Sequence, residues 1–260
     1  MAGVLVALLS AAFEFVCPDP ATAGIGVSAA SGSWRSALEG NPALLSCELS
    51  RAAAATVARP YDISGLYSGR LDVMVRPPET PLALGCGLAT NCLDRYQEHD
   101  LAFVASWGIL PNVTVGAGCH GLGQVWAGEV LDLLVAVDVG TAVQLGTLRI
   151  GLSGRRINVP RLHDGSELPP LIRVGGSWQP VSDVTLAVDL LREGAEESAA
   201  LGVELRLVPQ LRLKAGLTTL PMCYSGGIGV DVGPVRVDYA WQFHPQLKST
   251  HVAGAEVRWW

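Results

Sequence analysis

Charged side chains recur at every second position in several segments near the carboxyl end of the chain. In one segment, Arg236 and Asp238 alternate with Val235, Val237 and Tyr239. A period of two places the charged side chains on one face of a β-strand and the apolar ones on the other. Consecutive strands of this kind would bring their charges together on one wall. The residues that we expect to line this wall are Asp189, Glu204, Arg206, Arg212, Lys214, Arg236, Asp238, Glu256 and Arg258.

Two interpretations of these charges are open. Neighbouring strands hold opposite charges within reach of each other, so the residues can neutralise one another and hold an enclosed structure together. Alternatively, they line a narrow polar path or bind a polar headgroup. Neither interpretation needs a cofactor.

Arrangements typical of catalysis do not stand out. The sequence contains no G-x-S-x-G, H-E-x-x-H or G-x-x-x-x-G-K motif, which are the signatures of a nucleophile elbow, a zinc protease and a phosphate-binding loop. His99 and Asp100 are adjacent, so their side chains point to opposite faces of a strand and do not form a dyad. We therefore predict no catalytic residues and no enzyme.

The six cysteines give no sign of a metal site. None forms a C-x-x-C pair and no histidine lies at zinc spacing, so we expect neither structural zinc nor another metal. Cys86 and Cys92 are close enough in sequence to bridge a hairpin in an oxidising compartment, or they are free thiols that pack as small apolar residues.

The composition is too apolar for an ordinary soluble protein. Of the 260 residues, 49% are hydrophobic and 16% are charged, whereas about a quarter are charged in typical soluble domains. Beyond the amino terminus, no run reaches the roughly 18 apolar residues of a membrane helix. In a strand of a membrane barrel, lipid-facing apolar residues alternate with lumen-facing residues, so no long apolar run appears in the sequence. This composition therefore favours a transmembrane β-barrel. With a net charge of −6 and scattered basic residues, nucleic acid is not an expected partner.

Turn residues divide the chain from residue 48 onward into about fourteen segments of roughly ten residues. An even number of strands, with short turns at one end and longer loops at the other, predicts an all-β fold: a closed antiparallel transmembrane barrel. We expect tight turns near residues 77–79, 110–111, 180–181, 208–209 and 233–234. Longer connections are expected at 90–96, 154–170, 193–197 and 218–223, and two of the predicted strands are 129–139 and 142–153.

The two ends of the chain carry signals of export and assembly. An apolar run from Val4 to Ala12 is followed by Ala21-Thr22-Ala23, a small-x-small sequence that predicts a signal peptide over residues 1–23. The chain ends in Arg258-Trp259-Trp260. Trp260 suits an interfacial aromatic girdle, and we expect it to be the assembly signal that the barrel assembly machinery reads.

Asn41-Pro42-Ala43 and a series of further short motifs resemble the long-chain fatty acid transporter (FadL) superfamily, in particular its PorV/PorQ-type branch. Asn41-Pro42-Ala43 resembles the Asn-Pro-Ala motif that precedes the barrel in this superfamily. Further matches occur in order along most of the chain, at Tyr96–His99, Leu168–Gly175, Leu211–Gly216, Val237–Ala240 and Ser249–His251. The resemblance implies a fourteen-stranded barrel over residues 48–260 and a short amino-terminal plug over residues 24–47 that folds into the lumen.

Three functions follow as hypotheses from the barrel and the resemblance. The leading one is passive uptake or binding of small hydrophobic molecules in the bacterial outer membrane of a Gram-negative cell, with outer-membrane lipids around the barrel. The alternative is a PorV-like structural barrel that docks a protein-export complex. An outer-membrane enzyme is the third. An open apolar pocket in the lumen would favour the first, and a short plug the second.

Overall fold

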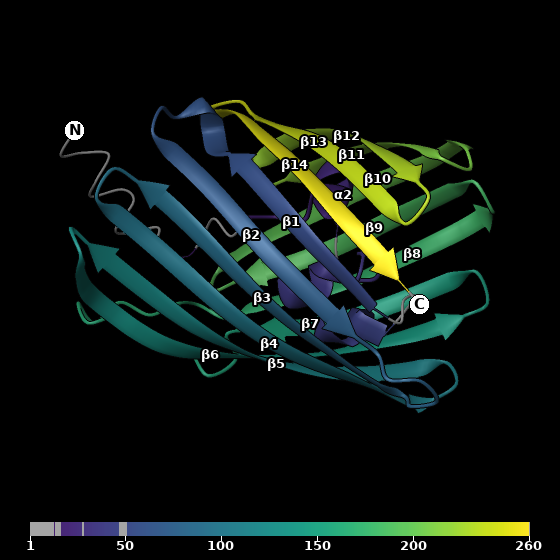
Figure 1. Ribbon diagram of the computed structural model, residues 1–260, viewed down its shortest axis with the longest axis horizontal. Coiled ribbons are helices and arrows are strands. Elements are labelled where there is room, and N and C mark those ends of the chain that lie inside the picture. The colour runs from purple at the N-terminus through teal and green to yellow at the C-terminus, as the bar shows by residue number, and fades with distance from the viewer. Residues whose placement is uncertain (1–12, 14–16, 28, 47–50, 260) are drawn as a thin grey trace.

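Within residues 13, 17–27, 29–46 and 51–259, which the computed structural model describes, fourteen antiparallel strands form one closed barrel (Figure 1). Each strand pairs with its neighbours in sequence, and β1 (Arg51–Arg59) closes the ring against β14 (Lys248–Trp259). The predicted fold class and strand number are confirmed. Closure leaves no unpaired strand edge, which such an apolar sheet could not safely expose.

The other strands follow in sequence order around the wall. They are β2 (Leu66–Val75), β3 (Leu82–Leu93), β4 (Tyr96–Leu110), β5 (Val113–Trp126), β6 (Glu129–Leu145), β7 (Leu148–Arg155), β8 (Leu171–Val181), β9 (Val184–Glu193), β10 (Glu196–Val208), β11 (Leu211–Thr219), β12 (Met222–Val232) and β13 (Val235–His244).

Alternation along each strand separates an apolar outer face from an inner face that is buried in the lumen. On β13, Val237 and Tyr239 are exposed on the outer face, while Arg236 and Asp238 are buried inside. On β4, Phe103 is exposed and its neighbour Val104 is buried. The period of two in the sequence therefore predicted which side of the wall each residue faces.

The two ends of the barrel differ chiefly in one long connection. At one end, here called the loop end, the connection 156–170 joins β7 to β8. The opposite end, the turn end, holds two-residue turns at 111–112, 209–210 and 233–234. Arg51 of β1 pairs with Trp259 of β14 at the turn end, so the barrel starts and finishes there.

Several predicted connections are wrong. The predicted longer connections at 90–96, 193–197 and 218–223 are two-residue turns at 94–95, 194–195 and 220–221. The predicted break between 139 and 142 is absent from the described strand β6, which continues through Gly140 to Leu145 and turns at 146–147. Gly140 lies inside the barrel against the plug, so it serves close backbone approach and not a turn.

Short helical elements precede the barrel and lie inside it (Figure 1). They are the helix α2 (Pro20–Ile25) and the 3-10 turns η1 (Arg35–Leu38) and η2 (Pro42–Ser46). A further 3-10 turn, η3 (Pro60–Asp62), belongs to the connection between β1 and β2. Among the described residues, no helix has both the length and the apolar character needed to cross a bilayer.

Candidate functional site: the plug and the charged lumen

The plug is the described part of the chain from Cys17 to Ser46. Asp19 begins the helix α2 by accepting a hydrogen bond from the Ala21 backbone N–H at 3.2 Å, which satisfies one of the amides that a helix leaves free. Gly26 ends the helix with φ 77°, a left-handed conformation that favours glycine. Trp34 and Leu38 pack against Met74 of the wall in one buried apolar cluster.

Asn41-Pro42-Ala43 ties two parts of the plug to the wall. The Asn41 side-chain amide donates to the carbonyl oxygens of Ala29, at 2.7 Å, and of Thr141 on β6, at 3.1 Å. Its oxygen accepts a hydrogen bond from the Ala43 backbone N–H at 3.1 Å. Because Asn41 is fully buried, each of these bonds satisfies a group that would be costly to leave unpaired.

Glycines on the inner face of the wall let the plug backbone lie directly against the strands. A Cβ at Gly140 would collide with Asn41, and one at Gly116 would lie 2.5 Å from the Ala43 nitrogen. The same relation holds at inner positions of β7, β8, β10 and β11. We call the whole set the glycine seat: Gly116, Gly140, Gly151, Gly175, Gly202 and Gly216.

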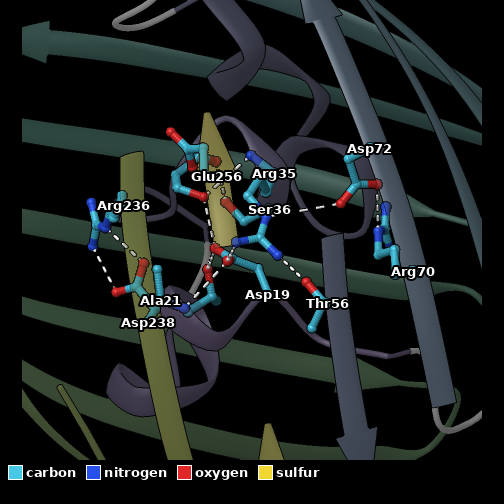
Figure 2. Close-up of polar contacts among 12 residues, drawn as sticks. Asp19, Ala21, Arg35, Ser36, Thr56, Arg70, Asp72, Arg236, Asp238 and Glu256 are labelled. Carbon is cyan, nitrogen blue, oxygen red and sulfur yellow. Dashed lines mark hydrogen bonds and ion pairs between the residues drawn. The ribbon is translucent and has the colours of Figure 1, made fainter. Parts of the chain in front are cut away.

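Buried charges join the plug to the neighbouring strands β1 and β2 (Figure 2). Arg35 forms an ion pair with Asp19 at 3.2 Å and lies 3.9 Å from Asp72 on β2. It also donates a hydrogen bond to Thr56 on β1. The side chains of Arg35, Asp19 and Asp72 are at most 1% exposed, so this group of charges is shielded from water.

Glu39 extends this network along the plug. Its carboxylate accepts a hydrogen bond from the Asp19 backbone N–H at 2.7 Å and lies 3.9 Å from Arg70, which pairs with Asp72 at 2.7 Å. Burial raises the pKa of Glu39 to about 7, although Arg70 opposes the shift. Burial also acts to raise the pKa of Asp19, but the Arg35 guanidinium, the Ser33 hydroxyl and Lys214 together hold that pKa below its ordinary value.

Cys17 lies at the start of the plug and is fully buried. Burial raises the pKa of its thiol to about 12, so the thiol stays protonated and unreactive at neutral pH. Cys86 and Cys92 are free thiols on the same strand, β3, and not partners across a hairpin.

The nine predicted lumen-lining charges all occupy inward positions, and most form ion pairs. Lys214 contacts Asp238 at 2.8 Å, and Arg236 contacts the same carboxylate at 2.7 Å. Glu204 lies 3.9 Å from Lys214. These charges therefore largely neutralise one another, which is one of the two interpretations that the sequence left open.

The remaining predicted charges lie around this group. Arg258 pairs with Glu256 and lies 3.8 Å from Asp231, which Arg212 contacts at 3.3 Å. Arg206 lies opposite Arg212 at the turn end and has no ion pair among the described residues. Asp189, on β9, accepts a hydrogen bond from the Ala29 backbone N–H of the plug at 2.9 Å. Trp260 lies outside the described residues.

A second cluster of charges on the inner wall was not among the sequence-based candidates. His120 on β5 lies between two carboxylates, 2.8 Å from Asp100 and 3.2 Å from Asp138. Arg155 reaches Asp138 at 3.1 Å. The alternation of residues in β4 and β5 indicates that Asp100 and His120 face inward. The contact between them could not be predicted, because the two residues are distant in the sequence. Among the described residues, no group of three or more side chains is placed to hold a metal ion.

An apolar depression of about 500 Å³ lies in the wall formed by β2 to β5. Its lining includes the outward-facing side chains of Cys86, Phe103 and Cys119, together with the inward residues Met74 and Val104. On the inner side, a Cβ at Gly85 would lie only 3.0 Å from a methyl group of Leu45 in the plug. The wall here is therefore one backbone thick between the depression and the apolar plug core.

Comparisons with solved structures show which proteins share this fold. The CymD monoaromatic hydrocarbon channel matches with a TM-score of 0.72 at 13% identity, covering 92% of this chain and 97% of the other. A FadL homologue from Pseudomonas aeruginosa gives 0.68 at 12% identity, covering 94% and 99%. The toluene transporter TodX from Pseudomonas putida gives 0.66 at 13% identity, covering 91% and 96%.

Sequence comparisons add no further relative, since neither a protein-family model nor a curated protein matches the chain. At these identities the structural matches concern the fold, and the similarity to the PorV/PorQ-type branch stays a prediction. The chain thus has the fold of a closed fourteen-stranded barrel with an internal plug, and in this fold it is similar to channels of the FadL type.

Proposed function

We propose that the protein is a bacterial outer-membrane barrel that binds small hydrophobic molecules and passes them passively into the membrane. The observation that carries the proposal is the apolar depression in the wall of β2 to β5, which lies one backbone away from the plug core. The described plug residues, 17–27 and 29–46, occupy the lumen and are held there by buried ion pairs and by the glycine seat. A lumen occupied in this way does not suit diffusion of large polar solutes. The fold of hydrocarbon channels supports an apolar cargo.

The outer membrane is proposed as the location because the exposed outer face is apolar on strand after strand. The exposed side chains include Leu101, Leu133, Leu190 and Val237, at 40%, 78%, 60% and 50%. A soluble protein rarely exposes such a continuous apolar surface to water. In barrels of this membrane the short turns face the periplasm. The turn end is therefore proposed to be periplasmic and the loop 156–170 to be outside.

The β2–β5 depression is the proposed exit from the wall. It is apolar, and only the backbone at Gly85 separates it from Leu45 of the plug. A hydrophobic molecule that enters at the loop end and follows the plug core would cross the wall here without passing through water. The movement needs no cofactor and no energy source, because the membrane interior is the lower free-energy environment for such a molecule.

Uptake by cells tests the proposal. Gram-negative cells that make the protein should take up a radiolabelled single-ring hydrocarbon faster than cells without it. Cys119→Trp, which fills the depression, should reduce the rate. Val237→Trp, which adds the same side chain to the outer face of β13, should not. Equal uptake with and without the protein, or loss of uptake in both variants, would contradict the proposed path.

A polar control distinguishes this function from that of a general pore. Liposomes that contain the protein should not swell faster in sugar solutions than liposomes without it. Rapid swelling would contradict the proposal that the plug keeps large polar solutes from passing through the lumen. Docking of a protein-export complex remains the alternative from the sequence, and the structural comparisons give it no support.

A further inference from the structure

The folded plug begins before the predicted cleavage site at Ala23. Cys17 and Asp19 are at most 1% exposed, and Asp19 is the closest carboxylate to Arg35. Cleavage after Ala23 would divide the helix α2 and remove Asp19 from a buried guanidinium. Removal of one partner from a buried ion pair is strongly destabilising. The structure therefore favours a mature chain that starts upstream of Cys17.

Phe13 is also part of the folded interior. Its side chain is 6% exposed and packs with Leu122 and Ala136 of the wall and with Leu162 and Leu168 of the 156–170 connection. Its φ is 60°, a left-handed value that is uncommon for a bulky residue. The Phe13 side chain therefore fills an apolar site at the loop end of the lumen.

The nitrogen of Phe13 points at a buried carboxylate. It lies 3.1 Å from Oε1 of Glu98, whose residue is 7% exposed. Glu98 also accepts hydrogen bonds from the Tyr96 hydroxyl at 2.7 Å and from the Asn91 amide at 3.1 Å. All three donors are neutral in the intact chain, and within the described residues Glu98 has no cationic partner. A buried carboxylate is ordinarily paired with a cation.

We propose that a leader peptidase hydrolyses the peptide bond between Ala12 and Phe13, and that the new α-ammonium group of Phe13 is the cation that pairs with Glu98. Water adds across the bond and leaves a carboxylate on Ala12 and an amine on Phe13, which is protonated at neutral pH. The bond follows Ser10-Ala11-Ala12, a small-x-small sequence that directly ends the apolar run from Val4. Ala21-Thr22-Ala23 lies farther from that run.

Hydrolysis at this bond also removes the constraint on Phe13. The left-handed φ is defined by the carbonyl carbon of the preceding residue, and in a first residue that carbon is gone. The same event thus supplies the missing positive charge and releases an uncommon backbone conformation. The mature chain would begin inside the lumen, under the 156–170 connection.

The first test identifies the mature amino terminus. The inference rests on the proposed outer-membrane location, so the full chain is made in Gram-negative cells and recovered from the outer membrane. Intact mass and amino-terminal sequencing should give Phe13 as the first residue. A chain in that membrane that starts at Gly24 or Met1 overturns the inference and leaves the proposed location intact. Absence of the protein from the membrane contradicts the location itself.

A second test examines the pairing, and it applies equally when residues 1–12 are replaced by the leader of another outer-membrane protein. An amine-reactive reagent should label the Phe13 amine about tenfold more slowly in the folded barrel than in denatured protein, since labelling then requires local opening. Glu98→Gln should remove most of this protection. Glu167→Gln, in the exposed Arg161 ion pair of the same loop end, should leave it unchanged. Equal labelling of the Glu98→Gln and unaltered proteins would overturn the pairing.

Discussion

Arg35 is the residue that connects the plug most directly to the wall. Its guanidinium contacts Asp19 in the plug, Asp72 on β2 and Thr56 on β1, and its side chain is 1% exposed. Asp19 has its closest cation in Arg35, whereas Asp72 also pairs with Arg70. In this setting, the cost of losing the cation comes mainly from the charges left without a partner.

Replacement of Arg35 by methionine should destabilise the docked plug by about 3–5 kcal/mol, the usual cost of breaking a buried ion pair. Urea unfolding of the protein in lipid vesicles measures this loss. Arg161→Met is the matched control, because the Arg161–Glu167 pair is 72% and 49% exposed and exposed pairs contribute at most about 1 kcal/mol. Equal losses in the two variants would contradict a structural role for the buried network.

Glu39 should make the stability of the plug depend on pH. Burial raises its pKa from the ordinary 4.5 to about 7, so the fold disfavours the ionised form. The stabilisation associated with protonated Glu39 is complete below pH 4.5 and is lost as the pH rises through about 7, by at most about 3 kcal/mol. Glu39→Gln cannot ionise and should flatten this dependence in urea unfolding between pH 5 and 8. Glu129→Gln, at an exposed position, should retain it.

At the scale of elements, the inner glycines explain how a plug of about thirty residues fits against the strands. Each position of the glycine seat brings the plug backbone or a buried side chain within contact of the strand backbone. The alternation of residues within a strand does not show that the plug must approach its backbone so closely. This close approach explains why the sequence predicts a break between residues 139 and 142, although β6 runs through Gly140 without interruption.

Gly116→Val should displace the plug and leave the barrel closed. The new Cβ would lie 2.5 Å from the Ala43 nitrogen, and backbone cannot move aside as a flexible side chain can, so overpacking should cost about 1–3 kcal/mol or more. The expected result is higher ion conductance in planar bilayers. Gly121→Val lies on the same strand, next to the exposed Leu101, where the nearest atom is 4.0 Å away. If both variants conduct like the unaltered protein, Gly116 does not seat the plug.

At the scale of the whole molecule, closure between β1 and β14 decides whether the protein behaves as one cooperative barrel. The nine paired positions from Arg51 to Arg59 complete the ring. We expect the purified protein to migrate in detergent gels as a compact form without boiling and as an unfolded form after boiling. Identical migration in the two conditions would contradict the closed barrel.

Trp260 stays a sequence-based prediction. Its neighbour Trp259 pairs with Arg51 and is 40% exposed on the outer face of the turn end. Deletion of Trp260 should lower the amount of protein that reaches the outer membrane, as measured by membrane fractionation. Deletion of a residue in the exposed 156–170 connection, such as Asp164, serves as a control for shortening the chain. Unchanged assembly without Trp260 would remove its role as a signal.

The sequence by itself determined the number of strands, their antiparallel order and the side of the wall that each residue faces. These features depend on local alternation and on turn residues, so a window of about ten residues is enough to recognise them. The predicted inner positions of Lys214 and Asp238 follow from this pattern alone. The alternation could not show which inner groups contact one another, because Asn41 bonds to Thr141 and Ala29 bonds to Asp189 across 100 and 160 residues.

Only the tertiary structure decided the path of the plug, the seat that receives it and the burial of Asp19, Glu98 and His120. Closing the barrel brings distant strands around one axis and excludes water from their inner faces. Under those conditions a charge needs a partner, and the partner is fixed by position in space and not by spacing in the chain. For the same reason Asp19, upstream of Ala23, is part of the described fold: the buried Arg35 needs its carboxylate as a partner.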